Sequence, residues 1–401
     1  MRNRLIATAA LAAAIAVPAG ALAQQRRPLT VEDLYRVGRV SQLAVSPSEP
    51  LAAFVVKRFD MEANTSVSHI WLADLERRES RRLTNAPESD WSPRFLPDGR
   101  LGFLSVRSGS PQVWAIDPDG GEAVQVTELA TGVESFVPAP DGEHLAVVAM
   151  VFPECGADMA CNAERAEAME SSKVKARVYT ELLYRIWDRW LDERRGHVLW
   201  VPLDGGDPRD LTPGDFQTPP LDLGGHSDLS VAPDSTEVAF TANTTDHPAW
   251  NTNNDVFAVS VAGGPPRNLT ARNEAVDAGP SYSPDGEYIA YVAMERPGFE
   301  ADRRVLHLYD RSTKKRIPIS DSLDRSVYGY AWAPESDAIF FYAPDRGRVS
   351  LYKASVPSGI VTRLVDEGTN TGVGVAPDGE TLVYLKQTLA SPAEVFTAND
   401  R

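Results

Sequence analysis

One short phrase recurs seven times along the chain and constrains its fold more than any other feature. In each copy, a turn led by proline, usually Pro-Asp-Gly, precedes an apolar run of strand length. Proline presets φ for a turn, aspartate accepts hydrogen bonds from turn amides, and glycine adopts positive φ at little cost. The prolines that lead the seven copies are Pro47, Pro97, Pro140, Pro233, Pro284, Pro334 and Pro377.

The spacing of the copies predicts a β-propeller. Five of the six intervals between successive prolines are 43 to 51 residues long, and the interval from Pro140 to Pro233 is 93 residues. Four-stranded propeller blades repeat at about 40–50 residues. The runs after the turns are apolar on both faces, as expected of strands that are covered on both sides. We therefore expect an all-β, seven-bladed propeller with WD40-like or TolB-like repeats over residues 41–401, preceded by a short segment at 24–40.

A second phrase lies between the turns and consists of a strand, a polar turn, and Leu-Thr or an equivalent pair. The seventh copy reaches only residues 395–400 before this phrase, so the sequence predicts that the last blade is truncated. The six earlier copies end at Leu83-Thr84, Val126-Thr127, Leu211-Thr212, Leu269-Thr270, Ile319-Ser320 and Leu364-Val365.

The long interval predicts a helical insertion at about 151–195. From about Ala163 to Glu193, apolar residues recur at steps of three and four, which indicates an amphipathic helix. Glu181 and Asp188 are two helical turns apart and would share a face of that helix. In addition, Glu181 and Arg185 have the order of an i,i+4 ion pair.

Two interpretations of the insertion stay open. In one, the helix only caps an end of the propeller and its charged side chains are solvated. In the other, its polar and aromatic side chains bind the amino end of a peptide, because carboxylates beside aromatic rings suit an ammonium group. The candidate binding residues are Glu181, Tyr184, Arg185, Trp187 and Asp188.

The first 23 residues predict a signal peptide. Arg2 and Arg4 precede an apolar run from Leu5 to Val17, and the small residues Ala21 and Ala23 follow. The run is shorter than the about 20 residues that a membrane-spanning helix needs. We expect cleavage after Ala23, a periplasmic or secreted protein, and no membrane association after cleavage. An uncleaved membrane anchor is the alternative.

Cys155 and Cys161 are the two cysteines of the chain. In an exported protein, this spacing favours a local disulfide. Two thiolates without a nearby histidine make a poor zinc site, which usually has four protein ligands. The six histidines are scattered singly along the sequence. We therefore expect neither a metal nor another cofactor.

The net charge and the absence of several catalytic motifs disfavour some classes of function. The formal net charge of −16 disfavours nucleic acid as a partner, whereas it is compatible with a cationic group such as a peptide amino terminus. The sequence contains no G-x-S-x-G nucleophile elbow, P-loop or H-E-x-x-H motif. Residues 224–228 place Gly, His, Ser and Asp together, but adjacent side chains point in different directions. We assign no catalytic residue.

Three segments resemble the dipeptidyl-peptidase 5-like enzymes of the prolyl oligopeptidase family, namely 174–190, 249–255 and 293–303. The resemblance covers essentially the whole mature chain. It implies the substrate-gating propeller of a serine peptidase that cleaves short peptides from the amino end. It also implies a downstream α/β-hydrolase domain with a Ser-Asp-His triad, so this chain alone is expected to be inactive. The insertion departs from the family at Ile186, where histidine is frequent.

Two other classes of propeller are alternatives. A TolB-like periplasmic propeller mediates protein–protein interaction and has similar repeats. Such proteins carry a separate α/β domain before the blades, whereas the repeats of this chain begin at Ser46. A propeller enzyme such as a polysaccharide lyase would instead need a metal or base cluster at the central channel.

Overall fold

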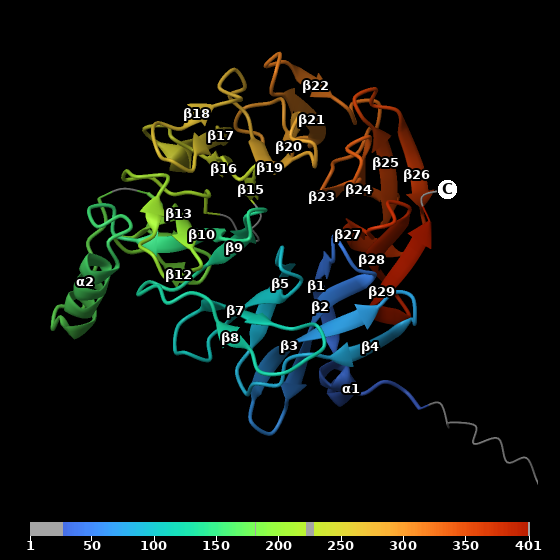
Figure 1. The fold of residues 1–401 in the computed structure, drawn as a ribbon, viewed down its shortest axis with the longest axis horizontal. Helices are drawn as coiled ribbons and strands as arrows, with labels where there is room; N and C mark the ends of the chain where they lie inside the picture. Colours follow the sequence, from blue (N-terminus) through green and yellow to red (C-terminus); the bar gives the residue numbers. More distant parts are fainter. Residues whose placement is uncertain (1–26, 181, 222–227, 400–401) are drawn as a thin grey trace, which may run out of the picture.

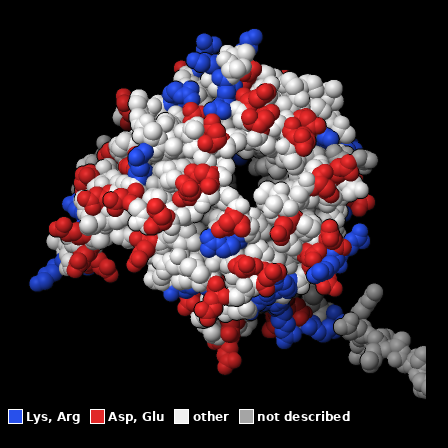
Figure 2. Space-filling model, viewed as in Figure 1, with Lys and Arg blue, Asp and Glu red and all other residues white. Residues whose placement is uncertain are grey.

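Antiparallel β-sheets surround a central opening in the computed structural model, which describes residues 27–180, 182–221 and 228–399 (Figure 1). Figure 2 shows the opening and the acidic side chains spread over the face around it. The arrangement confirms the all-β propeller with one helical insertion. The helices are α1 (Val31–Arg36), α2 (Met159–Ser171) and the 3-10 helix η1 (Pro248–Trp250). The predicted signal peptide lies outside the described residues.

Five four-stranded sheets make up most of the ring in the described chain. The first sheet contains β1 (Arg39–Val45), β2 (Leu51–Asp60), β3 (Thr65–Asp74) and β4 (Glu79–Arg82). The second contains β5 (Asp90–Phe95), β6 (Leu101–Ser105), β7 (Gln112–Ile116) and β8 (Val124–Gln125). The third contains β9 (Ser135–Pro138), β10 (His144–Val151), β13 (Arg195–Pro202) and β14 (Arg209–Asp210). The fourth contains β15 (Leu229–Val231), β16 (Glu237–Ala242), β17 (Asp255–Ser260) and β18 (Arg267–Asn268). The fifth contains β19 (Asp277–Tyr282), β20 (Tyr288–Ala293), β21 (Val305–Asp310) and β22 (Arg316–Pro318).

The remaining strands of the ring form two groups that are joined into one sheet. The first group contains β23 (Gly329–Trp332), β24 (Ala338–Asp345), β25 (Arg348–Ser355) and β26 (Val361–Val365). The second contains β27 (Thr369–Val375), β28 (Thr381–Thr388) and β29 (Ser391–Asn399). A single parallel pair, Val349 with Thr369, connects β25 to β27. Because of this connection, the strand pairing does not by itself separate seven blades, and that number stays a prediction.

The repeated turns link neighbouring sheets where glycine is replaced by serine. Ser235 and Ser336 occupy the glycine position of the Pro-Asp-Gly phrase, with φ of 58° and 61°. The Ser235 hydroxyl accepts a hydrogen bond from the Asp141 amide at 3.0 Å, and the Ser336 hydroxyl accepts one from the Asp285 amide at 3.1 Å. A left-handed backbone costs serine more than glycine. The bond to the preceding turn offsets this cost.

The buried core lies between successive sheets. Ala53 and Ile70 of the first sheet pack with Phe103 of the second, and comparable clusters follow around the ring. The ring closes where Phe54 of β2 packs against Val383 of β28. Apolar side chains on both faces of the strands are therefore buried, as the sequence predicted.

The loops that follow the second and fourth strands of each sheet emerge at the same end, because the strands are antiparallel. We call this end the insertion face. It includes segments 152–180, 182–194, 243–254, 294–304, 319–328 and 346–347. The Pro-Asp-Gly turns lie at the opposite end, which we call the turn face. The long loops are thus all on the insertion face.

Candidate functional site: the insertion face

The insertion connects β10 to β13 and contains helix α2, which projects outward from the ring (Figure 1). After α2 the chain forms a small hairpin of β11 (Arg185–Ile186) and β12 (Arg189–Trp190). The sequence-based prediction of a helix to about residue 193 is wrong beyond Ser171. Ala, Glu and Met in α2 are strong helix formers. The later segment is rich in Val, Tyr, Ile and Trp, which favour strands.

The hairpin changes the geometry assumed for the candidate binding residues. Glu181 lies outside the described residues, so its ion pair with Arg185 stays a prediction. Asp188 lies in the two-residue turn between β11 and β12, not on a helix face. Trp187 is the other turn residue and has φ of 48°. The helical argument for a shared carboxylate face therefore does not hold.

Aromatic rings gather on this hairpin. The rings of Tyr179, Tyr184 and Trp190 lie 5.5 to 6.2 Å apart, measured between centroids. The Tyr179 hydroxyl donates a hydrogen bond to the Leu191 carbonyl at 3.1 Å. Trp187 at the tip is 75% exposed. A bulky residue at positive φ is strained, and such strain is concentrated at functional sites. The hairpin thus presents an aromatic surface to solvent.

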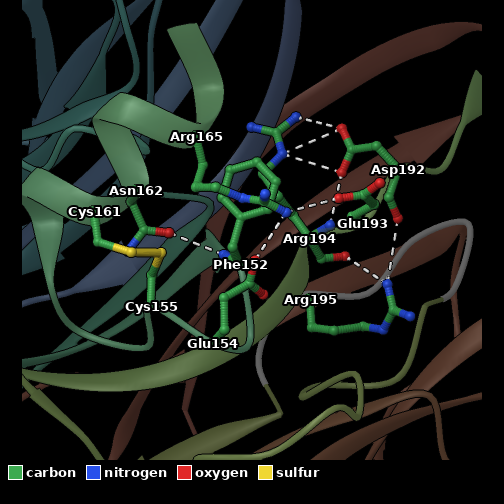
Figure 3. Close-up of polar contacts among 10 residues, drawn as sticks. All are labelled: Phe152, Glu154, Cys155, Cys161, Asn162, Arg165, Asp192, Glu193, Arg194 and Arg195. Carbon is green, nitrogen blue, oxygen red and sulfur yellow. Dashed lines mark hydrogen bonds and ion pairs between the residues drawn. A yellow bond between two sulfur atoms is a disulfide. The ribbon is translucent and has the colours of Figure 1, made fainter. Parts of the chain in front are cut away.

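A polar network anchors α2 to the propeller (Figure 3). Asn162 is fully buried; its side-chain oxygen accepts from the Phe152 amide at 2.9 Å, and its nitrogen donates to the Gly156 carbonyl at 2.9 Å. Cys155 and Cys161 form a disulfide with Cα atoms 5.6 Å apart. These contacts fix the first turn of α2 against the end of β10.

Ion pairs hold the return of the insertion to β13 (Figure 3). Arg165 of α2 pairs with Glu154 at 2.8 Å and with Glu193 at 3.0 Å. Asp192 pairs with Arg194 at 2.8 Å. Burial opposes ionisation of Asp192, but the hydrogen bonds from Arg194 outweigh this effect and lower its pKa. The carboxylates of this segment are therefore engaged in holding the insertion.

Neighbouring loops add further exposed aromatic side chains to the insertion face. Trp250, Phe299 and Tyr328 are 78%, 43% and 56% exposed. The Arg296 guanidinium lies 4.2 Å from the centre of the Phe299 ring and pairs with Asp302 at 2.7 Å. This pairing holds the pKa of Asp302 well below its usual range. Aromatic and arginine side chains are enriched where proteins bind peptides and other proteins.

Sequence reasoning missed these three aromatic residues as candidates. Trp250 and Phe299 lie in segments that resemble the peptidase family, but exposure cannot be read from a sequence. No pattern in the sequence singled out Tyr328.

Among the described residues, no group of three or more His, Cys, Asp or Glu side chains is placed to hold a metal ion. No helix of the described chain is long and apolar enough to cross a membrane.

The fold is similar to the β-propellers of solved peptidases. A solved acylaminoacyl peptidase has a TM-score of 0.69 at 17% identity, with 92% of this chain and 52% of that chain covered. The β-propeller domain of the Trilobed protease from Pyrococcus furiosus has a TM-score of 0.60 at 16% identity, with 91% and 97% covered. These similarities support the propeller fold. No family model matches the chain.

In sequence, the chain is similar to curated dipeptidyl-peptidases 5. The protein from Porphyromonas gingivalis is 24% identical over 380 residues, with 93% of this chain and 54% of that protein covered. The protein from Aspergillus fumigatus is 26% identical over 390 residues, with 88% and 53% covered. The chain thus spans about half the length of the curated relatives it matches.

Proposed function

We propose that this chain is the substrate-gating portion of an exported serine peptidase that cleaves short peptides from the amino end. The observation that carries the proposal is the similarity to dipeptidyl-peptidase 5, which extends over 93% of this chain but only 54% of the Porphyromonas gingivalis protein. In this proposal an α/β-hydrolase domain supplies the catalytic triad and the propeller limits access to it. The relatives are named as peptidases, so a TolB-like interaction propeller is less well supported.

The insertion face is the side on which we place the catalytic domain and the peptide. It carries the long loops and the exposed rings of Trp187, Trp250, Phe299 and Tyr328. Exposed apolar patches on a soluble protein mark binding surfaces. The turn face consists of short turns whose aspartates are satisfied within the turns, as Asp378 is by the amides of Glu380 and Thr381 at 3.0 and 2.8 Å.

Within this face, we assign the amino end of the peptide to Glu181, Tyr184, Arg185, Trp187 and Asp188. The support is the combination of exposed rings and an acidic side chain at the hairpin tip. A cation over an aromatic ring gains about 0.5–2 kcal/mol, depending on solvation. Arg185 pairs in register with Trp190 and would keep the hairpin in place.

A fusion of this propeller to the hydrolase domain of a close relative tests the assignment. Trp187→Ala and Asp188→Asn should each raise KM for dipeptidyl substrates with a free amino group, and affect an amino-blocked analogue much less. Asp98→Asn, on the turn face, is the matched control. Equal losses on both substrates would show that these residues only hold the hairpin, as in the capping interpretation.

Two measurements on the chain alone test the remaining parts of the proposal. The isolated chain should hydrolyse no dipeptidyl substrate, and a fluorophosphonate should label none of its serines, because it has no nucleophile elbow. Export would produce an amino terminus at Gln24 in periplasmic or secreted material. The disulfide fits an oxidising compartment and supports export. Serine labelling or an intact residue 1 in exported protein would contradict these parts.

A further inference from the structure

Two cavities adjoin each other on the insertion face, at the end of the sheet that contains β24, β25 and β26. Their volumes are about 410 and 310 Å³, and both are lined by Asp345, Arg346 and Arg363. The larger cavity also contacts Arg325 in the loop before β23, and the smaller one contacts Arg348. Four arginines from three segments of the chain therefore line these two adjoining cavities.

One carboxylate occupies the middle of this arginine cluster. Arg325 and Arg363 pair with the carboxylate of Asp345 at 2.9 and 3.2 Å, and Arg346 approaches it at 3.9 Å. The Asp345 side chain is 12% exposed, whereas those of Arg363 and Arg346 are 48% and 86% exposed. The hydrogen bond from Arg325 lowers the pKa of Asp345, so this carboxylate stays ionised. Three guanidinium groups are thus arranged around a single internal anion.

The guanidinium groups retain capacity for a second anion. Each guanidinium has five N–H donors, and one carboxylate offers about four acceptor sites. Asp324 and Asp366 lie at the rim, 3.5 Å from Arg325 and 3.7 Å from Arg363, and are 97% and 53% exposed. Exposed pairs of this kind contribute about 0–1 kcal/mol and are easily exchanged.

The walls of the larger cavity suit an organic ligand. Leu323, Tyr352 and Val361 line it together with the arginines. Binding sites for small ligands combine apolar walls with a few charged groups that fix orientation. Although the chain has 56 acidic and 40 basic residues, four arginines line these two cavities. Guanidinium groups match the planar geometry of carboxylates.

We propose that the cluster of Arg325, Arg346, Arg348 and Arg363 binds the carboxylate of a peptide, with Asp345 as an internal ligand that holds the arginines in place. The carboxylate part of this proposal rests on the pocket alone. The peptide part also rests on the proposed function, because the pocket opens on the face where we place the substrate. The arginines would then engage a peptide at its acidic or carboxyl-terminal group.

Fluorescence anisotropy of an alanine pentapeptide labelled at its amino end tests the proposal on the intact chain. The label blocks the amino group, so binding does not depend on the hairpin. The peptide with a free terminal carboxylate should bind at least about tenfold more tightly than its carboxyl-terminal amide, the factor that corresponds to about 1.4 kcal/mol. Equal affinities would overturn the proposal. Absence of binding by either peptide would overturn the peptide assignment.

Variants locate the binding and separate it from folding. Arg363→Gln and Arg325→Gln should each weaken binding of the free acid about tenfold or more. Arg100→Gln is the matched control, because Arg100 pairs with Asp98 at 2.7 Å on the turn face. Asp345→Asn should strengthen binding, because it removes the competing negative charge while the asparagine oxygen can still accept hydrogen bonds from the arginines. A urea midpoint measured for each variant shows that it is folded. Unchanged binding by folded Arg363→Gln would overturn the proposed carboxylate site. The proposed peptidase function is tested separately, by the fusion experiment.

Discussion

At the scale of single residues, five hydroxyl groups each accept a hydrogen bond within one of the five four-stranded sheets. In each case the hydroxyl of the Leu-Thr phrase accepts a hydrogen bond from the amide fourteen positions earlier, in the third strand of the same sheet, at 2.8 to 3.0 Å. A buried amide without an acceptor is costly. The sequence showed that Thr or Ser recurs, but the acceptor role depends on strand register and could not be read from spacing. The acceptors are Thr84, Thr127, Thr212, Thr270 and Ser320.

Replacement of Thr127 by valine tests this role. Thr127→Val removes the acceptor of the buried Val113 amide. It also removes the hydrogen bond that Thr127 donates to Gln112 Oε1 at 2.8 Å, although this oxygen keeps the bond from the Leu129 amide at 3.1 Å. We expect a loss of about 1–3 kcal/mol in the free energy of unfolding. Urea denaturation measures it. Thr362→Val on exposed β26 is the control, and equal effects of the two variants would contradict the hydrogen-bond argument.

Asp277 is a buried carboxyl group at the start of β19. It accepts a hydrogen bond from Asn273 at 2.9 Å and is only 1% exposed. Burial raises the pKa of Asp277 to about 7, and the nearby Asp255 acts in the same direction. Because the folded state holds this proton more tightly than the unfolded state, stability from this group is complete below about pH 4. It is lost as the pH rises towards 7.

The variant Asp277→Asn should therefore gain stability relative to the natural chain as the pH rises. Asparagine keeps the acceptor for Asn273 and has no charge to bury. The difference between the urea midpoints of variant and natural chain should increase from pH 5 to pH 8. Comparison of the two proteins at each pH cancels the titration of all other groups. A constant difference would show that Asp277 is ionised in the folded protein throughout this range.

At the scale of elements, the insertion shows what a sequence pattern does and does not determine. The sequence located the insertion between the second and third strands of the third sheet, and the structure has it there. Apolar periodicity predicted a helix through 174–190, yet Val174 and Val178 are 73% and 88% exposed. Periodicity indicates a helix only when a neighbour buries the apolar stripe, since most helical stability comes from packing. The aromatic hairpin was therefore beyond sequence reasoning.

Asn162 should control the mobility of α2. Its side chain bridges Phe152, Gly156 and Asp158 in a fully buried position. Asn162→Ala removes these bonds, so we expect faster amide exchange over residues 152–171, with a small change in the global urea midpoint. Glu167→Ala, an exposed change on the same helix, is the control. Unaltered exchange would mean that the disulfide alone fixes the helix.

At the scale of the whole molecule, the ring must close between its first and last strand groups. The repeat predicted the circular arrangement, because each copy needs two neighbours to bury its strands. It could not show how the ends meet. In the structure β1 and β2 lie beside β27 and β28, and Val383 joins Ala52 and Phe54 in one buried cluster (Figure 1). Side-chain packing thus holds this seam.

Glycine lets the two groups approach at the seam. A Cβ atom at Gly374 of β27 would lie 2.5 Å from Val45 Cγ2 on β1 and 3.2 Å from Val45 Cβ. The first distance is a clash, so Gly374→Ala requires the Val45 side chain or the strands themselves to shift. Overpacking of this kind costs about 1–3 kcal/mol. We expect a lower urea midpoint and faster amide exchange in β1 and β27.

The variant Val45→Ala provides the decisive comparison, because it removes the clashing Cγ2 atom and leaves a tight contact of 3.2 Å. Alone, it should destabilise the seam by loss of apolar contact. Combined with Gly374→Ala, it should recover part of the stability lost by that variant, so the double variant will be more stable than the sum of the single effects predicts. Urea midpoints of the four proteins measure this coupling. Strictly additive effects would show that β1 and β27 do not meet at these residues, and that the ring closes in another way.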